Sequence, residues 1–201
     1  MQNKNLISIF FLFQNLVLFA QPSIEWQKCL GGTGYDRPTF LQPSKDMIQQ
    51  TADSGFIIIG VTDSDNGDVT GFHGGGGDDY WVVKTDQTGN IQWQKCLGGT
   101  SSESASSVQQ TSDGGYIISG TTSSNNGDVT GNHGNEDYWI VKLNSGGNII
   151  WQKSLGGSGE DASYSIQQTS DSGFVIAGFS NSNNGDVSGN HGSHDFWVVK
   201  L

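Results

Sequence analysis

The sequence predicts an all-β protein built from three copies of a four-stranded unit. Three observations predict this fold class. A block reading Trp-Gln-Lys-(Cys/Ser)-Leu-Gly-Gly occurs three times, beginning at Trp26, Trp93 and Trp151. Glycine contributes 30 of the 201 residues and charged residues only 14%, a composition typical of short strands joined by tight turns. The chain beyond residue 20 shows no helical periodicity.

Three further sequence blocks recur in a fixed order within each repeat. They are Gln-Gln-Thr at 49–51, 109–111 and 167–169, Asn-Gly-Asp-Val at 66–69, 126–129 and 184–187, and an aromatic pair leading to Lys at 80–84, 138–142 and 196–200. Their order defines repeats over approximately 33–99, 100–157 and 158–201. The first repeat is longer than the second, chiefly between Leu30 and Thr51. Pro38 and Pro43 predict a longer surface loop there.

Each repeat is predicted to contain four strands, which are clearest in the second copy. Their expected bounds there are 107–111, 116–121, 138–143 and 148–155. Asp113-Gly114-Gly115 and Ser145-Gly146-Gly147 form the two hairpin turns, because Gly supplies the backbone conformations that such turns need. A polar loop at 123–136, rich in Asn, Gly and Asp, joins the second strand to the third.

The strand interiors favour propeller-like blades. Residues 56–59, 138–141 and 196–199 are apolar at consecutive positions, so both faces of each sheet must be covered. Blades packed between neighbouring blades satisfy this requirement. A three-fold β-prism or a β-trefoil is the alternative, although a sheet in those folds usually has one exposed face.

The two ends of the repeat region match different strands of the repeat. Residues 23–32 match a fourth strand and can complete the last blade, which reaches only its third strand at residue 201. Propellers usually have about four to eight blades. We therefore expect either a longer array, several chains in one ring, or an open ring whose blade edges allow self-association.

The N-terminus predicts export from the cell. Lys4 precedes two apolar stretches at 7–13 and 16–20, and Ala20 is a small residue suited to cleavage. This pattern is typical of a signal peptide over residues 1–20, followed by a β-repeat domain over 21–201. The interrupted stretch falls short of the ~20 apolar residues of a membrane span. We expect a secreted or cell-surface protein with no membrane span after cleavage.

The stretch at 144–157, Asn-Ser-Gly-Gly-Asn-Ile-Ile-Trp-Gln-Lys-Ser-Leu-Gly-Gly, resembles the tryptophan-docking motif of quinoprotein alcohol dehydrogenase propellers. The resemblance implies that Trp26, Trp93 and Trp151 wedge between adjacent blades. The quinone-binding and calcium-binding residues of those enzymes have no match in this sequence. The resemblance therefore implies a blade structure, and the enzymatic activity of that family does not carry over.

All three repeats more closely resemble the tandem units of bacterial extracellular proteins, which read NGDVSGNHG…DYWVVKL…GNIIWQKSLGG. Such proteins often end in a type IX secretion sorting domain, and some carry lectin-like labels. The resemblance implies a secreted or surface repeat protein. This sequence stops inside a repeat and shows no sorting domain, so we expect it to be part of a longer array.

Acidic and histidine side chains gather in the polar loops. Asp63, Asp65 and Asp68 form a candidate calcium site, since Ca²⁺ prefers oxygen ligands. The competing interpretation, which we favour, is that Asn-Gly-Asp is turn chemistry with side chains bonded to nearby backbone. The candidate ligand-binding residues are Asp128, His133, Asp186 and His191. No zinc set is expected, because the equivalent histidines come from separate repeats.

No catalytic residues are predicted. Acid pairs at 78–79 and 160–161 raise the possibility of glycoside hydrolysis, but acids beside a strand start are more often solvated. A net charge of −11 argues against nucleic acid as a partner. We expect a non-enzymatic binding or adhesion module for a glycan or protein. The alternative is a non-catalytic accessory portion of a secreted glycoside hydrolase.

The two cysteines occupy the same repeat position, with Ser154 in the third copy. Equivalent points on separate blades should lie beyond the ~7 Å limit for a disulfide. We therefore predict that Cys29 and Cys96 are unpaired.

Overall fold

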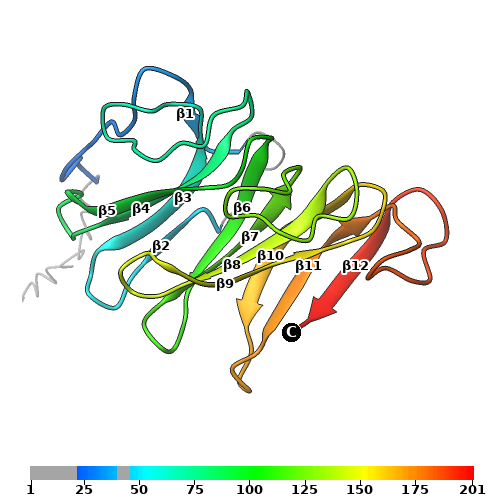
Figure 1. Ribbon diagram of the computed structural model, residues 1–201. Helices are drawn as coiled ribbons and strands as arrows, with labels where there is room; N and C mark the ends of the chain where they lie inside the picture. The colour runs from blue at the N-terminus through cyan, green and yellow to red at the C-terminus, as the bar shows by residue number, and fades with distance from the viewer. Residues whose placement is uncertain (1–21, 40–45) are drawn as a thin grey trace, which may run out of the picture.

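The computed structural model describes residues 22–39 and 46–201, and this part of the chain holds twelve antiparallel strands and no helix. The strands form three sheets that stand side by side along the molecule (Figure 1). The all-β repeat class predicted from the sequence is therefore confirmed. The predicted signal peptide, residues 1–20, lies outside the described residues.

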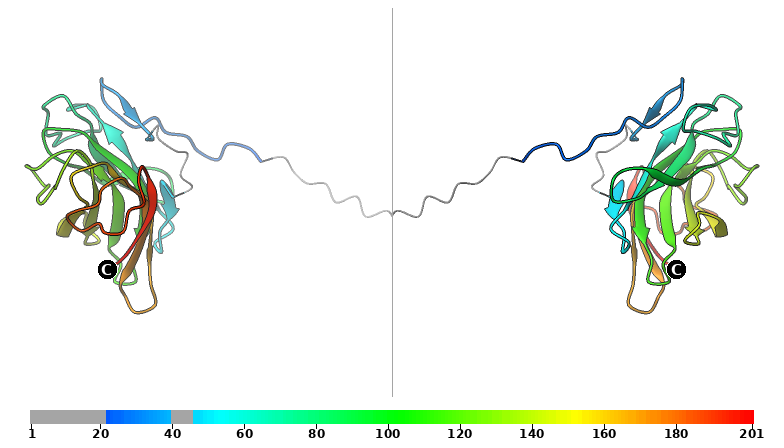
Figure 2. Two further views of the ribbon diagram at one scale, coloured as in Figure 1. Left: turned by 90° about the vertical axis from the view of Figure 1, so that its right-hand side faces the viewer. Right: turned by 90° about the vertical axis from the view of Figure 1, so that its left-hand side faces the viewer.

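Each repeat forms one sheet of antiparallel neighbours. The first sheet contains β1 (Asp36–Arg37), β2 (Ile48–Gln50), β3 (Phe56–Thr62), β4 (Asp79–Thr85) and β5 (Ile91–Leu97). The second contains β6 (Glu103–Gln110), β7 (Tyr116–Thr122), β8 (Asp137–Leu143) and β9 (Ile149–Leu155). The third contains β10 (Asp161–Gln168), β11 (Phe174–Ser180) and β12 (Asp195–Lys200). Figure 2 shows the sheets layered one behind another when viewed from either side.

The extra residues of the first repeat interrupt its first strand. Both β1 and β2 pair with β3, with Arg37 opposite Val61 and Ile48 opposite Ile58. The two short strands correspond to the two ends of β6, which is continuous. The insertion predicted as a surface loop thus divides an inner strand, and its residues 40–45 lie outside the described part of the chain.

One predicted strand boundary is wrong. The first strand of the second sheet begins at Glu103, not at Ser107. A register shift between Ala105 and Ser107 marks a β-bulge inside the strand. Glu103 at the start of the strand accepts hydrogen bonds from the Gly99 N–H (2.8 Å) and the Thr122 hydroxyl (2.6 Å), so a polar residue that resembles a loop residue lies inside the strand.

The hairpin turns follow the predicted chemistry. In the second sheet, the carboxylate of Asp113 accepts hydrogen bonds from the Gly115 N–H (2.9 Å) and from Nζ of Lys142 (3.0 Å). Gly114 has a φ of 80°, which favours glycine at this position. The first and third sheets repeat the Asp–Lys pair. Each turn is thereby fastened to the end of the third strand of its own sheet.

The hydrophobic core lies between the sheets. Tyr80 of β4 packs on Trp139 of β8 with ring centroids 4.7 Å apart, and Tyr138 packs on Trp197 of β12 at 4.6 Å. Every residue of β8 is buried, which confirms that both faces of the predicted apolar run at 138–141 are covered. Along the run at 56–59, buried and partly buried residues alternate. The prediction is wrong for 196–199, where Phe196 and Val198 are exposed. Burial alternates along β12, because the described residues place no sheet on its outer face.

The repeated tryptophans also connect neighbouring sheets. Trp93 of β5 packs against Tyr116 of the second sheet, and its Nε1 donates to the Ser145 carbonyl (3.2 Å). A Cβ added at Gly147 would lie 2.8 Å from the Trp93 ring, so this turn needs a glycine. The side chain of Trp93 is partly buried between the two sheets.

Residues 23–32 lie against the first sheet. Trp26 stacks 5.8 Å from Phe56, and its ring approaches Gly89 as Trp93 approaches Gly147. This segment is not hydrogen-bonded to β12, which pairs with β11. Completion of the last blade by residues 23–32 therefore stays a prediction.

Candidate functional site

The candidate calcium ligands do not converge in the structure. Oδ1 of Asp63 accepts the Tyr35 N–H (2.5 Å), and Oδ2 of Asp68 accepts the Gly31 N–H (3.1 Å). Asp65 is exposed. Within residues 22–39 and 46–201, no group of three or more His, Cys, Asp and Glu side chains is arranged to hold a metal ion. Calcium binding stays a prediction with no geometric support from these residues.

The Asn-Gly-Asp blocks join distant loops. In the second sheet, Oδ1 of Asn126 accepts the Thr100 N–H (2.9 Å), and the Asp128 N–H donates to the Gly98 carbonyl (2.8 Å). The Gly98 N–H donates in return to the Asp128 carboxylate (3.3 Å). The block therefore fastens a polar loop to the segment that enters its sheet. The block forms the favoured turn, since the Val129 N–H donates to the Asn126 carbonyl (3.1 Å). Its side chains, however, bond to backbone 26 and 30 residues away and not to nearby backbone.

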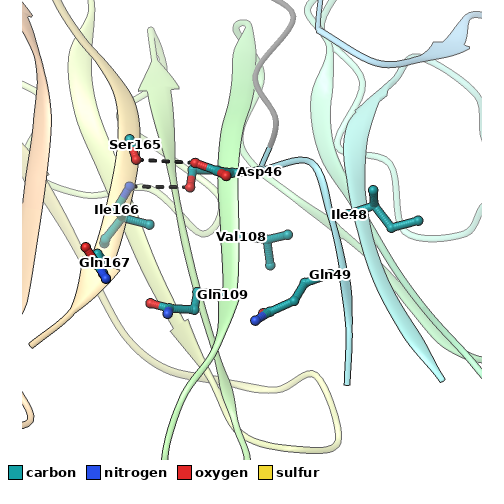
Figure 3. A pocket seen from close by; sticks show the side chains of 9 residues that line it. Asp46, Ile48, Gln49, Val108, Gln109, Ser165, Ile166 and Gln167 are labelled. Atoms are coloured by element: carbon teal, nitrogen blue, oxygen red, sulfur yellow. Dashed lines mark hydrogen bonds between the residues drawn. The ribbon is translucent and has the colours of Figure 1, made fainter. Parts of the chain in front are cut away.

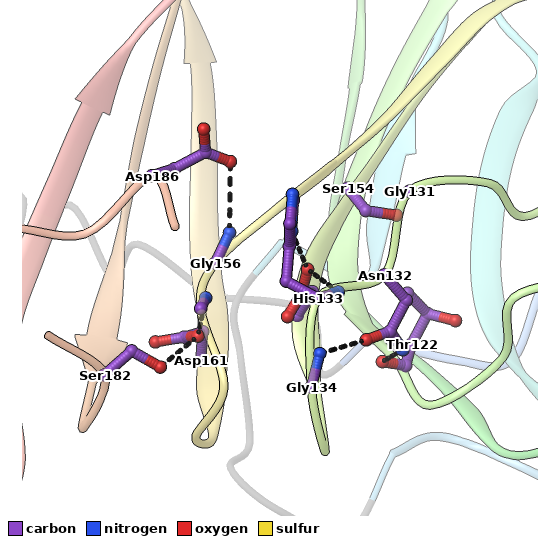
Figure 4. A network of polar contacts seen from close by, with 12 residues as sticks. Thr122, Gly131, Asn132, His133, Gly134, Ser154, Gly156, Asp161, Ser182 and Asp186 are labelled. Atoms are coloured by element: carbon purple, nitrogen blue, oxygen red, sulfur yellow. Dashed lines mark hydrogen bonds and ion pairs between the residues drawn. The ribbon is translucent and has the colours of Figure 1, made fainter. Parts of the chain in front are cut away.

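The third repeat forms the same connection. Asp186 accepts the Gly156 N–H (3.4 Å), as Figure 4 shows. Asn184 accepts the Ser158 N–H (2.8 Å). Two of the candidate ligand-binding residues, Asp128 and Asp186, thus hold the fold together at equivalent positions.

The other two candidate ligand-binding residues, His133 and His191, each pair with the aspartate that begins the third strand of their sheet. Nδ1 of His133 lies 2.7 Å from Oδ2 of Asp137, and Nδ1 of His191 lies 2.9 Å from Oδ2 of Asp195. His73 and Asp79 form the same pair in the first sheet at 2.7 Å. Each of these three histidines thus pairs with an aspartate of its own sheet.

A buried pair of carboxyl groups lies at each junction between neighbouring sheets. Asp79 faces Glu103 at the first junction, and Asp137 faces Asp161 at the second; all four side chains are buried. A Cβ at Gly98 would lie 2.7 Å from Oδ1 of Asp79 and 2.4 Å from Oε2 of Glu103. The two carboxyl groups therefore point into the same small space.

Sequence reasoning missed these junction acids. Asp79 and Asp161 were interpreted as solvated loop residues, and the structure shows that this is wrong. Each acid on the entering strand accepts three hydrogen bonds, as Asp161 does from the Gly157 N–H, Ser180 and Ser182. The available signal was that each acid recurs beside a Gly-Gly pair and has Ser or Thr partners in the next strand.

Burial changes the acidity of these groups. Removal from water raises the pKa of Asp79 and of Glu103, and Asp137 behaves in the same way at the second junction. At the exposed turn, the hydrogen bond from Lys84 lowers the pKa of Asp53 to about 2. The junction acids and the turn acids therefore affect stability in different pH ranges.

We expect stability to peak in mildly acidic solution. A carboxyl group with a raised folded-state pKa stabilises most below its unfolded pKa of about 4 and loses that contribution as the pH rises through the folded pKa. Asp53 acts oppositely, since its contribution disappears as the pH falls towards 2. His73 and Asp128 also face the first junction, and Nε2 of His73 lies 3.6 Å from the Asp128 carboxylate.

Thermal melts should therefore show a rising midpoint from pH 7.5 to about 5 and a falling midpoint below about 3. Glu103→Gln should reduce the rise, and Glu25→Gln, at an exposed position, should leave it unchanged. A midpoint that falls between pH 7.5 and 5 in the unmodified chain would contradict this account of the junctions.

A concave cavity lies where the innermost strands of the three sheets meet (Figure 3). Its volume is about 300 Å³, and equivalent residues of β2, β6 and β10 line it. These are an apolar set, Ile48, Val108 and Ile166, and an amide set, Gln49, Gln109 and Gln167, joined by Ser107, Ser165 and Asp46. The cavity thus offers amides, hydroxyls and one carboxylate around apolar side chains.

The amides also link the inner strands. Oε1 of Gln49 accepts the Gln110 N–H (2.6 Å), and Oε1 of Gln109 accepts the Gln168 N–H (2.7 Å). Sequence reasoning did not identify this cavity, because it depends on how three separate repeats meet.

Both cysteines are free, as predicted, with Cys29 exposed and Cys96 buried. Burial raises the pKa of Cys96 to about 12, so its thiol stays protonated and unreactive near neutral pH.

Comparison with known proteins assigns no family: no family model matches the chain, and no curated protein matches it. A search of the described residues for helices long and apolar enough to cross a bilayer finds none.

Proposed function

We propose that the chain is a secreted or cell-surface, non-enzymatic binding module whose three sheets are blades arranged side by side around an axis. Its ligand site is the cavity between the innermost strands, and the ligand is a neutral polar molecule such as a short glycan. The observation that carries the proposal is that equivalent residues of three repeats line one concave space.

The chemistry of the cavity supports this ligand class. Ligand pockets are concave, have volumes from about 300 Å³ upwards, and combine apolar walls with a few polar groups. Gln49, Gln109 and Ser165 can donate and accept hydrogen bonds, as the hydroxyl groups of a sugar require. Among the described residues that line the cavity, Asp46 carries the one ionisable side chain. A weakly charged site of this kind suits a neutral ligand better than an anion.

The position of the acids supports a non-enzymatic function. Glycoside hydrolysis needs two carboxyl groups that flank the substrate. The facing carboxyl pairs at the sheet junctions are closed off from solvent, with Asp79 and Asp161 fully buried. A polymeric substrate cannot reach them without separating the sheets.

A glycan array tests the proposal with variants that fill the cavity or leave it open. The unmodified chain is expected to bind at least one glycan class, and Ser165→Trp, which fills the cavity from an exposed position, should weaken that binding at least tenfold. The matched control is Ser112→Trp, at an exposed turn outside the cavity. Equal binding by both variants would place the ligand elsewhere, and no binding by any chain would reject the glycan.

A further inference from the structure

The third sheet has an open edge and an uncovered apolar face. Phe196 and Val198 of β12 are 95% and 61% exposed. Their equivalents in the other sheets, Tyr80 with Val82 and Tyr138 with Ile140, are fully buried against the next sheet. In the first two sheets a fourth strand also pairs with this third strand. In the described residues, β12 has neither a fourth strand nor a covering sheet.

The opposite end of the molecule has a matching apolar hollow. A cavity of about 220 Å³ lies on the outer face of the first sheet, where Ile58, Trp81 and Val83 line it together with Leu30 of the N-terminal segment. In the second sheet, the equivalents of these sheet residues are Ile118, Trp139 and Val141, which pack against Tyr80 and Val82. The hollow is therefore the place where the third strand of a preceding sheet would pack.

The N-terminal segment already lies where the fourth strand of a preceding sheet would lie. Trp26 contacts Phe56 and Gly89 as Trp93 contacts Tyr116 and Gly147. The Asp68 N–H donates to the Gly31 carbonyl (3.0 Å), as the Asp128 N–H does to the Gly98 carbonyl (2.8 Å). Residues 26–30 thus keep both contacts of a fourth strand with the following sheet but are not paired with a third strand.

The polar groups at the two ends are complementary as well. At the internal junctions, the Glu103 N–H donates to the Asp78 carbonyl (2.7 Å), and the Asp161 N–H donates to the Glu136 carbonyl (2.7 Å). If the third sheet of another copy lay before the first sheet, the same pattern would have the Asp36 N–H donate to the His194 carbonyl of that copy. The Gln50 N–H would likewise donate to Oε1 of Gln167, as the Gln110 N–H donates to Oε1 of Gln49.

We propose that residues 26–30 of one copy of the chain pair antiparallel with β12 of a second copy, so that Phe196 and Val198 enter the hollow over Trp81. The pairing of β8 with β9 sets the register, which places Leu30 opposite Phe196, Lys28 opposite Val198 and Trp26 opposite Lys200. Phe196 then meets Trp81 as Tyr138 meets Trp197. This proposal depends on the blade arrangement proposed above and is independent of glycan binding.

Two copies are the expected assembly. A head-to-tail contact forms a ring if its rotation closes and a filament if it does not. Two copies supply six sheets, within the usual range of about four to eight blades. A single chain that closes on itself would have to form a ring of three, below that range. Pairing with a second copy also covers the free edge of β12, which otherwise invites uncontrolled association.

Sedimentation of the purified chain tests the assembly. At micromolar concentration the unmodified chain should sediment with the mass of two copies. Phe196→Asp should weaken association at least tenfold, because it places a charge in an apolar contact. The matched control is Ile150→Asp, at an exposed apolar residue of β9, which should sediment as the unmodified chain does. A single-copy mass for the unmodified chain would overturn the proposal.

Engineered cysteines test the register and identify the partner. In a chain with Cys29 and Cys96 replaced by serine, Lys28→Cys with Val198→Cys should form a disulfide between copies, since directly opposed residues on neighbouring strands are about 4.5–5.5 Å apart. Gln27→Cys with Val198→Cys is the control, because those side chains point to opposite faces. A disulfide within one chain would show self-closure and overturn the second-copy proposal, as would equal cross-linking by both pairs.

Discussion

Replacement of Trp139 by alanine is expected to destabilise the chain by about 3–5 kcal/mol. Trp139 is fully buried between the first two sheets, where its ring packs 4.7 Å from Tyr80. Its Nε1 also donates to Oε1 of Gln152 (2.8 Å), so the substitution leaves a cavity and removes a hydrogen bond. Denaturant unfolding followed by circular dichroism measures the loss.

The matched control is Trp26→Ala. The Trp26 ring packs against Phe56 of the first sheet but is 39% exposed. It should cost less than half as much, because much of the ring already contacts water. Equal losses for Trp139 and Trp26 would mean that the first junction is not the buried core described above.

Asp161→Ala is the second substitution with a large expected effect, on the order of 3–5 kcal/mol. The carboxylate is buried and accepts hydrogen bonds from the Gly157 N–H (2.7 Å), Ser182 (2.8 Å) and Ser180. Each buried donor left without an acceptor costs about 1–3 kcal/mol. The measurement is again the free energy of unfolding in denaturant.

Asp36→Ala supplies the comparison within the same protein. Asp36 accepts equivalent bonds from Gly32 (2.7 Å), Thr62 (2.6 Å) and Ser64 (3.0 Å), but it is only partly buried. Water can replace part of the hydrogen bonding of Asp36, so Asp36→Ala should reduce the free energy of unfolding by less than Asp161→Ala does. If Asp36→Ala costs as much as Asp161→Ala, burial at the second junction is not what makes Asp161 important.

The repeats made much of the fold predictable from the sequence. The apolar run at 138–141 is covered on both faces, as expected, and the Asp-Gly-Gly turn at Asp113 joins its predicted hairpin. The run at 196–199 differs, because no sheet covers Phe196 and Val198. The confirmed features depend on local sequence. A run of consecutive apolar residues places apolar side chains on both faces of a strand, and a glycine-containing turn is determined by the residues of the turn itself. Such information lies within a few residues along the chain.

The junctions between repeats could not be predicted in the same way. Asp79 and Asp161 look like loop acids, because their burial depends on a facing sheet. The hydroxyl partners of Asp161 also lie 19 and 21 residues away along the chain. Asp128 looked like a ligand residue, and its carboxylate instead accepts a backbone N–H that lies 30 residues earlier. Composition does not show whether a polar side chain forms hydrogen bonds within the protein or with a ligand, since both use the same donors and acceptors.

The same limit applies to the candidate site. Each glutamine that lines the inner cavity was visible in a repeated Gln-Gln-Thr block. Nothing in the block alone shows that Gln49, Gln109 and Gln167 face a common space. Their convergence follows from the way in which β2, β6 and β10 come together.

Distances between equivalent loop positions test the central claim, that the sheets are blades arranged side by side in an arc. Spin labels at the exposed positions Asp65, Asn125 and Asn183, in a chain without its native cysteines and diluted with unlabelled chain, give three distances by pulsed electron resonance. The account predicts similar distances for 65–125 and 125–183 and a clearly longer one for 65–183. Three equal distances would contradict it, because they require the three-fold symmetry of a β-prism, a β-trefoil or a closed three-bladed ring.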